Sequence, residues 1–342
     1  MNKEINVAVV GATGAVGEAF LSILAERKLP LANVHALASE RSVGDTVDFG
    51  NRELDVENLA EFDFSRVDYG LFSAGASVSE VHARRALAAG CTVIDNTSCF
   101  RYDDDIPLVV PEVNGHILDT FEQPGIIANP NCSTIQMVVA LAPIHRAVGI
   151  SRINVATYQS VSGAGRKATE ELARQTADRL TFKESEPVVF QQAIAFNALP
   201  QIDSLQDNDY SREEMKMHWE TQKIFADKEI AVNATAVRIP VFYGHGEAVH
   251  LETRQALSID AATDLIQAAA GVCLVDARAE HQHPTQLSHA AGTDEVFVGR
   301  LRRDHTHENG INMWIVSDNI RKGAALNAIQ IMEVLAGCGP GG

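Results

Sequence analysis

The chain of 342 residues is 46% hydrophobic and 21% charged, which is typical of folded globular proteins, and it is longer than one hydrophobic core usually grows. Lys and Arg total 28 against 45 Asp and Glu, and the net charge of -17 argues against binding to nucleic acid or to anionic lipid. The N-terminus does not resemble a secretory signal, and no apolar stretch is long enough to span a bilayer. We therefore expect a cytoplasmic protein of two domains that does not bind membranes.

The first residues predict a strand, a glycine-rich turn and a helix. Residues 5–10 form an apolar run, the segment Gly11-Ala12-Thr13-Gly14-Ala15-Val16-Gly17 follows directly, and residues 18–27 have apolar side chains at helical spacing. Glycines let a backbone approach a pyrophosphate closely, and a helix N-terminus offers N–H groups to the phosphates. This context favours a dinucleotide-binding site over a merely tight turn.

The next strand, at residues 34–38, ends in a segment that bears on the choice between NAD and NADP. An acidic residue at this point commonly binds the ribose 2′-hydroxyl of NAD. Here the sequence is Ala38-Ser39-Glu40-Arg41-Ser42, in which Arg41 with Ser39 or Ser42 can hold a 2′-phosphate. We predict NADP, and Glu40 leaves NAD as the alternative.

The alternation of strands and helices continues up to about residue 131. Strands are expected at residues 69–73, 92–95 and 125–128, with a helix at residues 79–89. This order predicts a parallel sheet with helices on both faces.

Beyond residue 133 the pattern changes to longer strands without regular helical crossovers. Such an order predicts an α+β domain with a mostly antiparallel sheet, and a last helix, about residues 324–335, is expected to pack on the first domain. The expected helices are residues 134–148 and 168–180, and the expected strands are residues 153–160, 231–241, 249–257, 296–301 and 311–317.

The five cysteines are scattered and include no CxxC pair, so we expect neither a disulfide framework nor a metal site. Cys132 lies in Asn129-Pro130-Asn131-Cys132-Ser133-Thr134, where a strand ends and a helix begins. The dipole and N–H groups of a helix N-terminus stabilise a thiolate and the oxyanion that it forms on attacking a carbonyl. Cys132 is therefore the candidate nucleophile, and an inert buried cysteine is the alternative.

Three further residues are candidates for the same chemistry. His245, in Tyr243-Gly244-His245-Gly246-Glu247, is predicted to lie in a glycine-flanked turn between two strands and to move protons. Arg238 can hold a carboxylate by two hydrogen bonds, although an arginine on a strand is more often at the surface. Gln159 begins a loop of small residues and can orient a water or a carbonyl group.

Taken together, these segments resemble the bacterial aspartate-β-semialdehyde dehydrogenase family along nearly the whole chain. The order and spacing of the matching motifs make chance agreement implausible. They are residues 11–17, Asn96-Thr97-Ser98-Cys99-Phe100-Arg101, Val109-Val110-Pro111-Glu112-Val113-Asn114, residues 129–136, 158–165, Arg212-Glu213-Glu214-Met215-Lys216, residues 238–245, and Asp318-Asn319.

The resemblance implies a Rossmann-type dinucleotide-binding domain and an α+β catalytic and dimerisation domain. The first would be residues 1–131, completed by a C-terminal helix at residues 323–337, and the second residues 132–322. It also implies a homodimer, or a tetramer built from dimers.

The resemblance assigns a role to each site residue. The catalytic set is Cys132, His245 and Gln159; Arg238 would hold the substrate α-carboxylate, Glu213 the α-amino group, and Arg101, Asn131 and Lys216 the phosphate. The set assigned to NADP is Gly11, Thr13, Gly14, Ala15, Val16, Ser39, Arg41, Ser42, Ser162, Gly163 and Asn319, with Asn319 near the nicotinamide.

The implied reaction converts L-aspartyl-4-phosphate and NADPH into L-aspartate-4-semialdehyde, phosphate and NADP. The thiolate would expel phosphate to leave a thioester, which hydride then reduces. The chain departs from many family members at Gly246, where serine is common, and at Cys99. Two alternatives are a related reductase for N-acetylglutamyl phosphate and a non-catalytic or weakly active paralogue. The first is disfavoured by Gln159 and the segment from Glu213 to Lys216, which favour the aspartyl enzyme. The second is disfavoured by the joint presence of Cys132, Gln159, Arg238 and His245.

Overall fold

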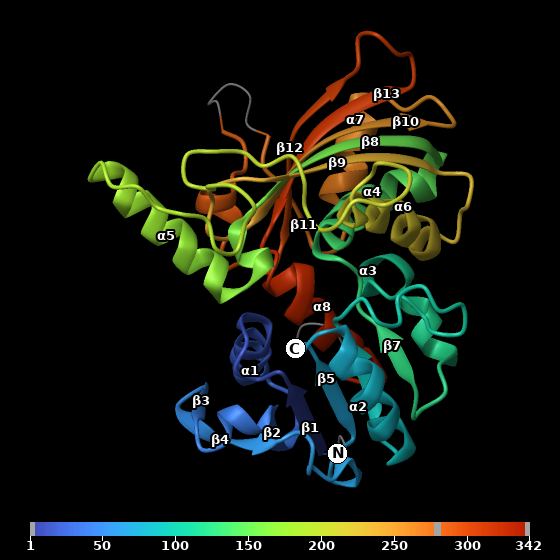
Figure 1. The fold of residues 1–342 in the computed structure, drawn as a ribbon. Helices are drawn as coiled ribbons and strands as arrows, with labels where there is room; N and C mark the ends of the chain where they lie inside the picture. Colours follow the sequence, from blue (N-terminus) through green and yellow to red (C-terminus); the bar gives the residue numbers. More distant parts are fainter. Residues whose placement is uncertain (1–3, 277–281, 339–342) are drawn as a thin grey trace. The chain divides into compact units, whose positions relative to one another are not determined.

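The computed structural model describes residues 4–276 and 282–338. The chain divides into two compact units, which we call unit 1 and unit 2. Unit 1 comprises Met1–Asn131 and Ala324–Gly342, and unit 2 is Cys132–Gly323. Unit 2 is therefore inserted in the sequence between the two segments that build unit 1 (Figure 1).

Unit 1 is built on a seven-stranded sheet of order β3-β4-β2-β1-β5-β6-β7. Neighbouring strands are parallel except for the antiparallel pair β3 and β4 at one edge. The central strands are continuous apolar runs, as expected for a sheet that is covered on both faces. The strands are β1 Ile5–Val10, β2 Leu31–Ala38, β3 Thr46–Phe49, β4 Arg52–Asn58, β5 Tyr69–Phe72, β6 Thr92–Asp95 and β7 Ile126–Ala128.

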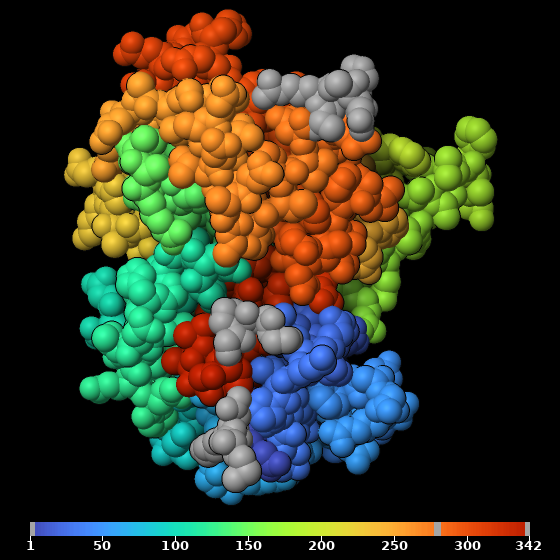
Figure 2. All heavy atoms as spheres, turned by 180° about the vertical axis from the view of Figure 1, so that it is seen from behind, coloured from blue at the N-terminus to red at the C-terminus, as the bar shows by residue number. Residues whose placement is uncertain are grey.

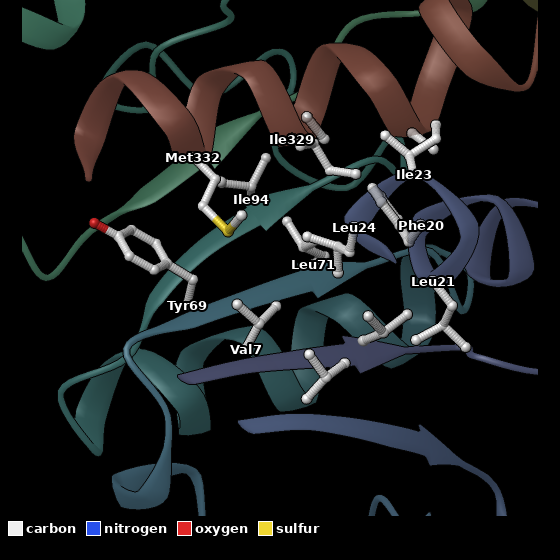
Figure 3. Packing of buried hydrophobic residues seen from close by; sticks show 14 of the residues in the cluster. Val7, Phe20, Leu21, Ile23, Leu24, Tyr69, Leu71, Ile94, Ile329 and Met332 are labelled. Atoms are coloured by element: carbon white, nitrogen blue, oxygen red, sulfur yellow. The ribbon is translucent and has the colours of Figure 1, made fainter. Parts of the chain in front are cut away.

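Helices cover both faces of the unit 1 sheet. Helix α1 (Ala15–Glu26) and the C-terminal helix α8 (Leu326–Leu335) share one core, in which Phe20 and Leu24 of α1 and Ile329 of α8 are buried together with strand residues (Figure 3). Helix α2 (Ala76–Ala88) packs against β5 and β6 from the other side (Figure 3). The short helix α3 (Pro111–Asn114) contacts α8.

Unit 2 is built on a six-stranded mixed sheet of order β11-β12-β13-β10-β8-β9. The three central pairs are antiparallel, and the pairs β11–β12 and β8–β9 at the two edges are parallel. The expected two-domain fold, a Rossmann-type unit with a second unit containing a mostly antiparallel sheet, is confirmed. The strands are β8 Ile150–Gln159, β9 Ala231–Arg238, β10 His245–Thr253, β11 Val272–Leu274, β12 Val296–Arg303 and β13 Gly310–Ser317.

Helix α4 (Cys132–Val148) lies against this sheet and contacts β8, β10, β12 and β13, while α6 (Arg212–Phe225) packs on β9 and α7 (Ile259–Gln267) on β11 and β12. Eleven of the 17 residues of α4 are buried, which explains its apolar sequence all round. Helix α5 (Arg166–Leu180) projects from the rest of unit 2 in both views (Figures 1 and 2). No helix of the described residues is long and apolar enough to cross a bilayer.

Candidate active site

Unit 1 contains a cavity of about 570 Å³ at the carboxyl ends of β1, β2 and β5. This is the edge at which open parallel sheets bind nucleotides. Of the residues that the sequence assigned to the cofactor, Gly11, Thr13, Gly14, Ser39 and Arg41 line it. Most of the other lining residues lie after strands that are far from the glycine turn in the sequence, and no sequence motif marks them as part of a nucleotide site. They are Ala38, Glu40, Asn58, Leu59, Ala60, Ser73, Ala74, Val78 and His82.

The backbone of the glycine turn is packed too closely to accept side chains. Because glycine has none, the backbone of the turn stays accessible to a ligand. A Cβ at Gly17 would lie 2.1 Å from the Gly11 carbonyl oxygen, and Gly11 has a φ of +88°. Helix α1 follows without a side-chain cap at Gly14, and Ala15 and Val16 form its first turn. The N–H groups of this turn and the adjoining cavity fit a dinucleotide phosphate.

The residues that bear on the choice between NAD and NADP lie in one short turn. Glu40–Ser42 forms a single 3-10 turn, and Ser39, Glu40 and Arg41 line the cavity whereas Ser42 does not. The cavity therefore offers a carboxylate and a guanidinium group from adjacent residues.

Cys132 is the first residue of α4 and is partly exposed. The helix has no acidic residue in its first turn, so no carboxylate there opposes a thiolate. The residue before it, Asn131, and Arg101 belong to unit 1 and are 7% and 6% exposed. Arg101 Nη2 donates a hydrogen bond of 2.8 Å to the Asn96 carbonyl oxygen.

A chain of hydrogen bonds runs from the start of α4 through β8 to α6. Gln159 Nε2 donates to Ser133 Oγ at 2.9 Å and to Glu213 Oε1 at 3.1 Å. Glu213 Oε2 accepts a hydrogen bond of 2.9 Å from Lys216 Nζ, which also donates to Asp203 Oδ2 at 2.9 Å. Burial is the largest single influence on the pKa of Lys216 and lowers it, but the Glu213 and Asp203 carboxylates together outweigh burial and raise the pKa, so this ammonium group stays charged.

Arg238 ends β9 directly opposite Gln159 of β8 and is 6% exposed. Burial is the largest influence on its pKa and lowers it, while Glu213 and Cys132 act in the opposite direction. The charge of Arg238 in turn favours the carboxylate of Glu213 and the thiolate of Cys132. Its Nη1 donates a hydrogen bond of 2.8 Å to the Ser160 carbonyl oxygen.

The expectation that His245 lies in a turn is wrong, because His245 is the first residue of β10 and is fully buried. Its Nδ1 lies 3.1 Å from the Ser160 backbone nitrogen and 3.1 Å from Ser160 Oγ. Burial, followed by the charge of Arg238, lowers the pKa of His245 to about 3, although Glu213 and the Gly244 backbone act in the opposite direction. The imidazole is therefore neutral at physiological pH.

Asn319 connects the loop after β8 to the turn before β10. Its Oδ1 accepts hydrogen bonds from Ser160 Oγ at 3.0 Å and from the Gly244 backbone N–H at 3.0 Å, and its Nδ2 donates to Ser162 Oγ at 3.0 Å. Gly163 lies beside this cluster, where a Cβ would approach Arg238 Nη1 to 3.0 Å.

The structure thus brings together, within unit 2, all the predicted residues that belong to that unit: Cys132, Gln159, Ser162, Gly163, Glu213, Lys216, Arg238, His245 and Asn319. The sequence missed Ser160 and Asp203. Ser160 contacts His245, Arg238 and Asn319, yet in the sequence it is one small residue of a loop. Asp203 comes from an irregular segment whose partner on α6 is 13 residues away.

Comparisons with known proteins give a consistent result for both units. Residues 6–121 match the family model "Semialdehyde dehydrogenase, NAD binding domain", and residues 141–322 match "Semialdehyde dehydrogenase, dimerisation domain". An aspartate-semialdehyde dehydrogenase from Legionella pneumophila is 60% identical over 335 residues, which cover 98% of this chain and 96% of the relative.

Solved structures agree with these matches. A crystal structure of aspartate semialdehyde dehydrogenase II from Vibrio cholerae, complexed with ASA, has a TM-score of 0.95 and 55% identity, over 97% of this chain and 98% of that one. The enzyme from Candida albicans, crystallised with NADP, has a TM-score of 0.76 and 25% identity over 97% of this chain and 98% of that one.

Proposed function

Because the chain belongs to the aspartate-semialdehyde dehydrogenase family, we propose that it reduces L-aspartyl-4-phosphate to L-aspartate-4-semialdehyde with NADPH, through a thioester on Cys132. The resemblance inferred from the sequence is thereby confirmed at the level of the family. The observation that supports the mechanism best is the cluster in unit 2 of a helix-initiating cysteine, a buried cation and a buried neutral imidazole.

Cys132 is the proposed nucleophile. Its thiolate adds to the acyl carbon of the substrate, the electron pair of the carbonyl moves to oxygen, and phosphate leaves when that pair returns. The N–H groups in the first turn of α4 are suited to bind the oxyanion, because they point toward the N-terminal end of the helix, where Cys132 lies. His245 handles protons at the sulfur and the carbonyl oxygen, and Gln159 orients the acyl group.

The substrate groups match the charges at the site. Arg238 binds the α-carboxylate and Glu213 the α-amino group, so one cation and one anion in the same cluster receive an amino acid zwitterion. We assign the phosphate to Arg101, Asn131 and Lys216, as the family resemblance implies. In a chain of net charge -17, such local cations are needed to bind a phosphorylated dicarboxylate.

The cavity and glycine turn of unit 1 are suited to NADP, which supplies the hydride when it is bound. The phosphates are assigned to the turn and the first residues of α1, at Gly11, Thr13, Gly14, Ala15 and Val16, and the 2′-phosphate to Ser39, Arg41 and Ser42. Ser162, Gly163 and Asn319 are assigned to the nicotinamide side. The NADP in the Candida albicans relative supports this choice.

We further propose that unit 2 forms a homodimer, alone or as part of a tetramer. The family model that covers it is described as a dimerisation domain. Its projecting helix α5 and the following segment carry exposed apolar side chains, among them Phe182 at 99%, Val188 at 80% and Leu180 at 67% exposure. Apolar surface of this kind is typical of an interface.

One assay tests the reaction and the cofactor together. Purified protein is incubated with aspartate semialdehyde, phosphate and either NADP or NAD, and reduction of the cofactor is followed by absorbance. We expect phosphate-dependent reduction of NADP, with lower kcat/KM for NAD. N-acetylglutamate semialdehyde is the matched control, and a higher rate with that aldehyde would contradict the proposal, as would the lack of any phosphate-dependent rate.

A further inference from the structure

The ammonium group of Lys216 is held between two carboxylates that come from different parts of unit 2. Glu213 precedes Lys216 by one turn of α6, whereas Asp203 belongs to the irregular segment before that helix. Each accepts a hydrogen bond of 2.9 Å from Lys216 Nζ, and the lysine side chain is only 12% exposed. An ammonium group has three N–H donors, so these two contacts set its orientation and leave one N–H for a ligand.

The carboxylate of Asp203 is itself held in one orientation. Its Oδ1 accepts a hydrogen bond of 2.8 Å from the Ser204 backbone N–H, so that Oδ2 is the oxygen presented to Lys216. The backbone of Asp203 has a φ of +70°, in the left-handed region that few residues other than glycine adopt. This backbone conformation and the Ser204 contact together direct the side chain toward Lys216.

The segment that carries Asp203 is fastened at both ends. At one end Leu199 exchanges two backbone hydrogen bonds of 2.8 and 2.9 Å with Arg238. At the other end the Ser204 carbonyl oxygen accepts a hydrogen bond of 2.7 Å from the Arg212 N–H, where α6 begins. Asp203 and Arg238 also line the same cavity, of about 560 Å³. The segment thus connects the strand that carries Arg238 to the helix that carries Lys216.

Glu213 alone would leave Lys216 less well ordered. Pairs of opposite charge three residues apart on a helix contribute little, because the long lysine side chain keeps much of its freedom. Asp203 supports the ammonium group from outside the helix. Burial raises the pKa of Asp203, but the hydrogen bonds from Lys216 and Ser204 outweigh burial and lower it, so this carboxylate is ionised at neutral pH.

We propose that Asp203 is a positioning residue that holds the ammonium group of Lys216 in the orientation in which its remaining N–H binds the phosphate of the substrate. This inference rests on the proposed function, in which Lys216 binds that phosphate. Asp203 acts through Lys216 and takes no part in making or breaking bonds. An ammonium group that is already oriented loses less freedom when the phosphate binds, so the phosphate is bound more tightly.

Two substitutions separate the hydrogen bond of Asp203 from its charge. Asp203→Asn and Asp203→Gly both remove the charge, but only the asparagine oxygen can still accept a hydrogen bond from Lys216. Glycine adopts a positive φ without strain. The KM for phosphate is measured during oxidation of aspartate semialdehyde. We expect a value about fivefold or more higher in Asp203→Gly than in Asp203→Asn, and equal values would overturn the proposal.

A second comparison asks whether Asp203 acts through Lys216. The same KM is measured in Lys216→Ala and in the double variant Lys216→Ala with Asp203→Gly. We expect the second substitution to have no further effect once the lysine is absent. An additional rise as large as that in the single variant would reject the positioning role. The KM for aspartate semialdehyde should differ by less than about twofold between Asp203→Asn and Asp203→Gly, and an equal rise in both KM values would show a general loss of structure instead.

Asp209→Gly is the matched control. Asp209 also has a positive φ, of +64°, and is exposed in the same irregular region before α6. This variant should keep the parent KM for phosphate, and a rise equal to that of Asp203→Gly would mean that loop flexibility explains the effect. A parent enzyme without phosphate-dependent activity would reject the proposed function. An active parent with equal KM values in Asp203→Asn and Asp203→Gly would reject the role of Asp203 alone.

Discussion

Arg238 Nη1 donates a hydrogen bond of 2.8 Å to the carbonyl oxygen of Ser160, and thereby connects the end of β9 to the loop after β8. This contact holds one edge of the guanidinium group inside the protein. The planar group can bind a carboxylate through its other N–H groups only in the orientation that this hydrogen bond sets.

Arg238→Lys should therefore raise the KM for aspartate semialdehyde about tenfold or more, with a smaller effect on kcat. A lysine is a point charge that cannot make both the Ser160 contact and a two-point contact with a carboxylate. Steady-state kinetics measure the effect. Arg254→Lys is the matched control, because Arg254 pairs with Asp227 at the surface of the same unit, and its KM should stay within twofold of the parent value. An unchanged KM in Arg238→Lys would remove this residue from the carboxylate site.

Cys132→Ser should abolish turnover while NADP still binds, because a serine hydroxyl is a far weaker nucleophile at neutral pH than a thiolate. Turnover and fluorescence titration with NADPH measure the two effects. Cys273→Ser, on β11, is the control that should keep its activity. A near-normal rate in Cys132→Ser would show that no thioester forms.

Iodoacetamide should label Cys132 before the other cysteines, and substrate should slow the labelling. Burial raises the pKa of Cys91 to about 12 and also raises that of Cys99, so both remain thiols at neutral pH. Mass spectrometry of partly labelled enzyme gives the order of reaction. Slow and equal labelling of all five cysteines would favour a non-catalytic paralogue.

Gly17→Ala should weaken dinucleotide binding about tenfold or more and destabilise unit 1, since its Cβ would overlap the backbone at Gly11 and Ala12. Titration with NADPH and thermal unfolding measure the two losses. Gly115→Ala is the control, because its φ is -56° and the nearest atom to a Cβ there is 3.8 Å away. If Gly17→Ala behaved like Gly115→Ala, the close packing of the turn would not matter for binding.

Glu247→Gln should stabilise the protein increasingly as the pH rises. Glu247 is fully buried on β10, burial raises its pKa well above the ordinary value, and a contact with Gln136 only partly offsets this. A carboxyl group with a raised pKa in the folded state favours folding at low pH. Above the unfolded pKa, near 4.3, the unfolded state loses its proton first, so the free energy of unfolding falls by up to about 1.4 kcal/mol per pH unit.

Glutamine does not ionise in this pH range, so the free energy of unfolding of Glu247→Gln should not fall in this way as the pH rises. Urea unfolding of parent and variant at pH 5 and pH 8 measures the difference, which should be small at pH 5 and clearly in favour of the variant at pH 8. Glu308→Gln, at an exposed position, should give no such divergence. A parent protein that was more stable than Glu247→Gln at pH 8 would mean that the buried carboxylate is ionised and partnered.

The nucleotide-binding half of unit 1 could be predicted from sequence because its signals are local. An apolar run, three glycines and a helical pattern lie within 22 residues, and the structure has β1 and α1 there. The antiparallel edge strands β3 and β4 were not predicted, because β3 has only four residues, of which one is buried, and β4 has one buried residue of seven. Helix α6 was also not predicted as a helix, although Ser211 and Glu214 form the capping box that marks its start.

The wrong prediction that His245 lies in a turn came from the glycines on either side of it. Gly244 has a φ of +83° and ends the irregular segment between β9 and β10, as its residue type suggests. Gly246 has another reason, since a Cβ there would lie 2.6 Å from the Trp314 ring. The second glycine therefore permits close packing inside a strand and is not part of the turn. Contacts such as those of Ser160 lie beyond sequence patterns altogether, because they join segments up to 159 residues apart.

The insertion of unit 2 between the two segments of unit 1 has a consequence for synthesis of the chain. Residues of α8, among them Ile329 and Met332, complete the core around Leu24, yet they are translated after all of unit 2 (Figure 3). At about 5–20 residues per second, the ribosome needs about 10–40 s to add the roughly 190 intervening residues. Throughout that interval the nascent N-terminal segment presents an uncovered apolar face, and a polypeptide released before residue 324 should aggregate or be bound by chaperones.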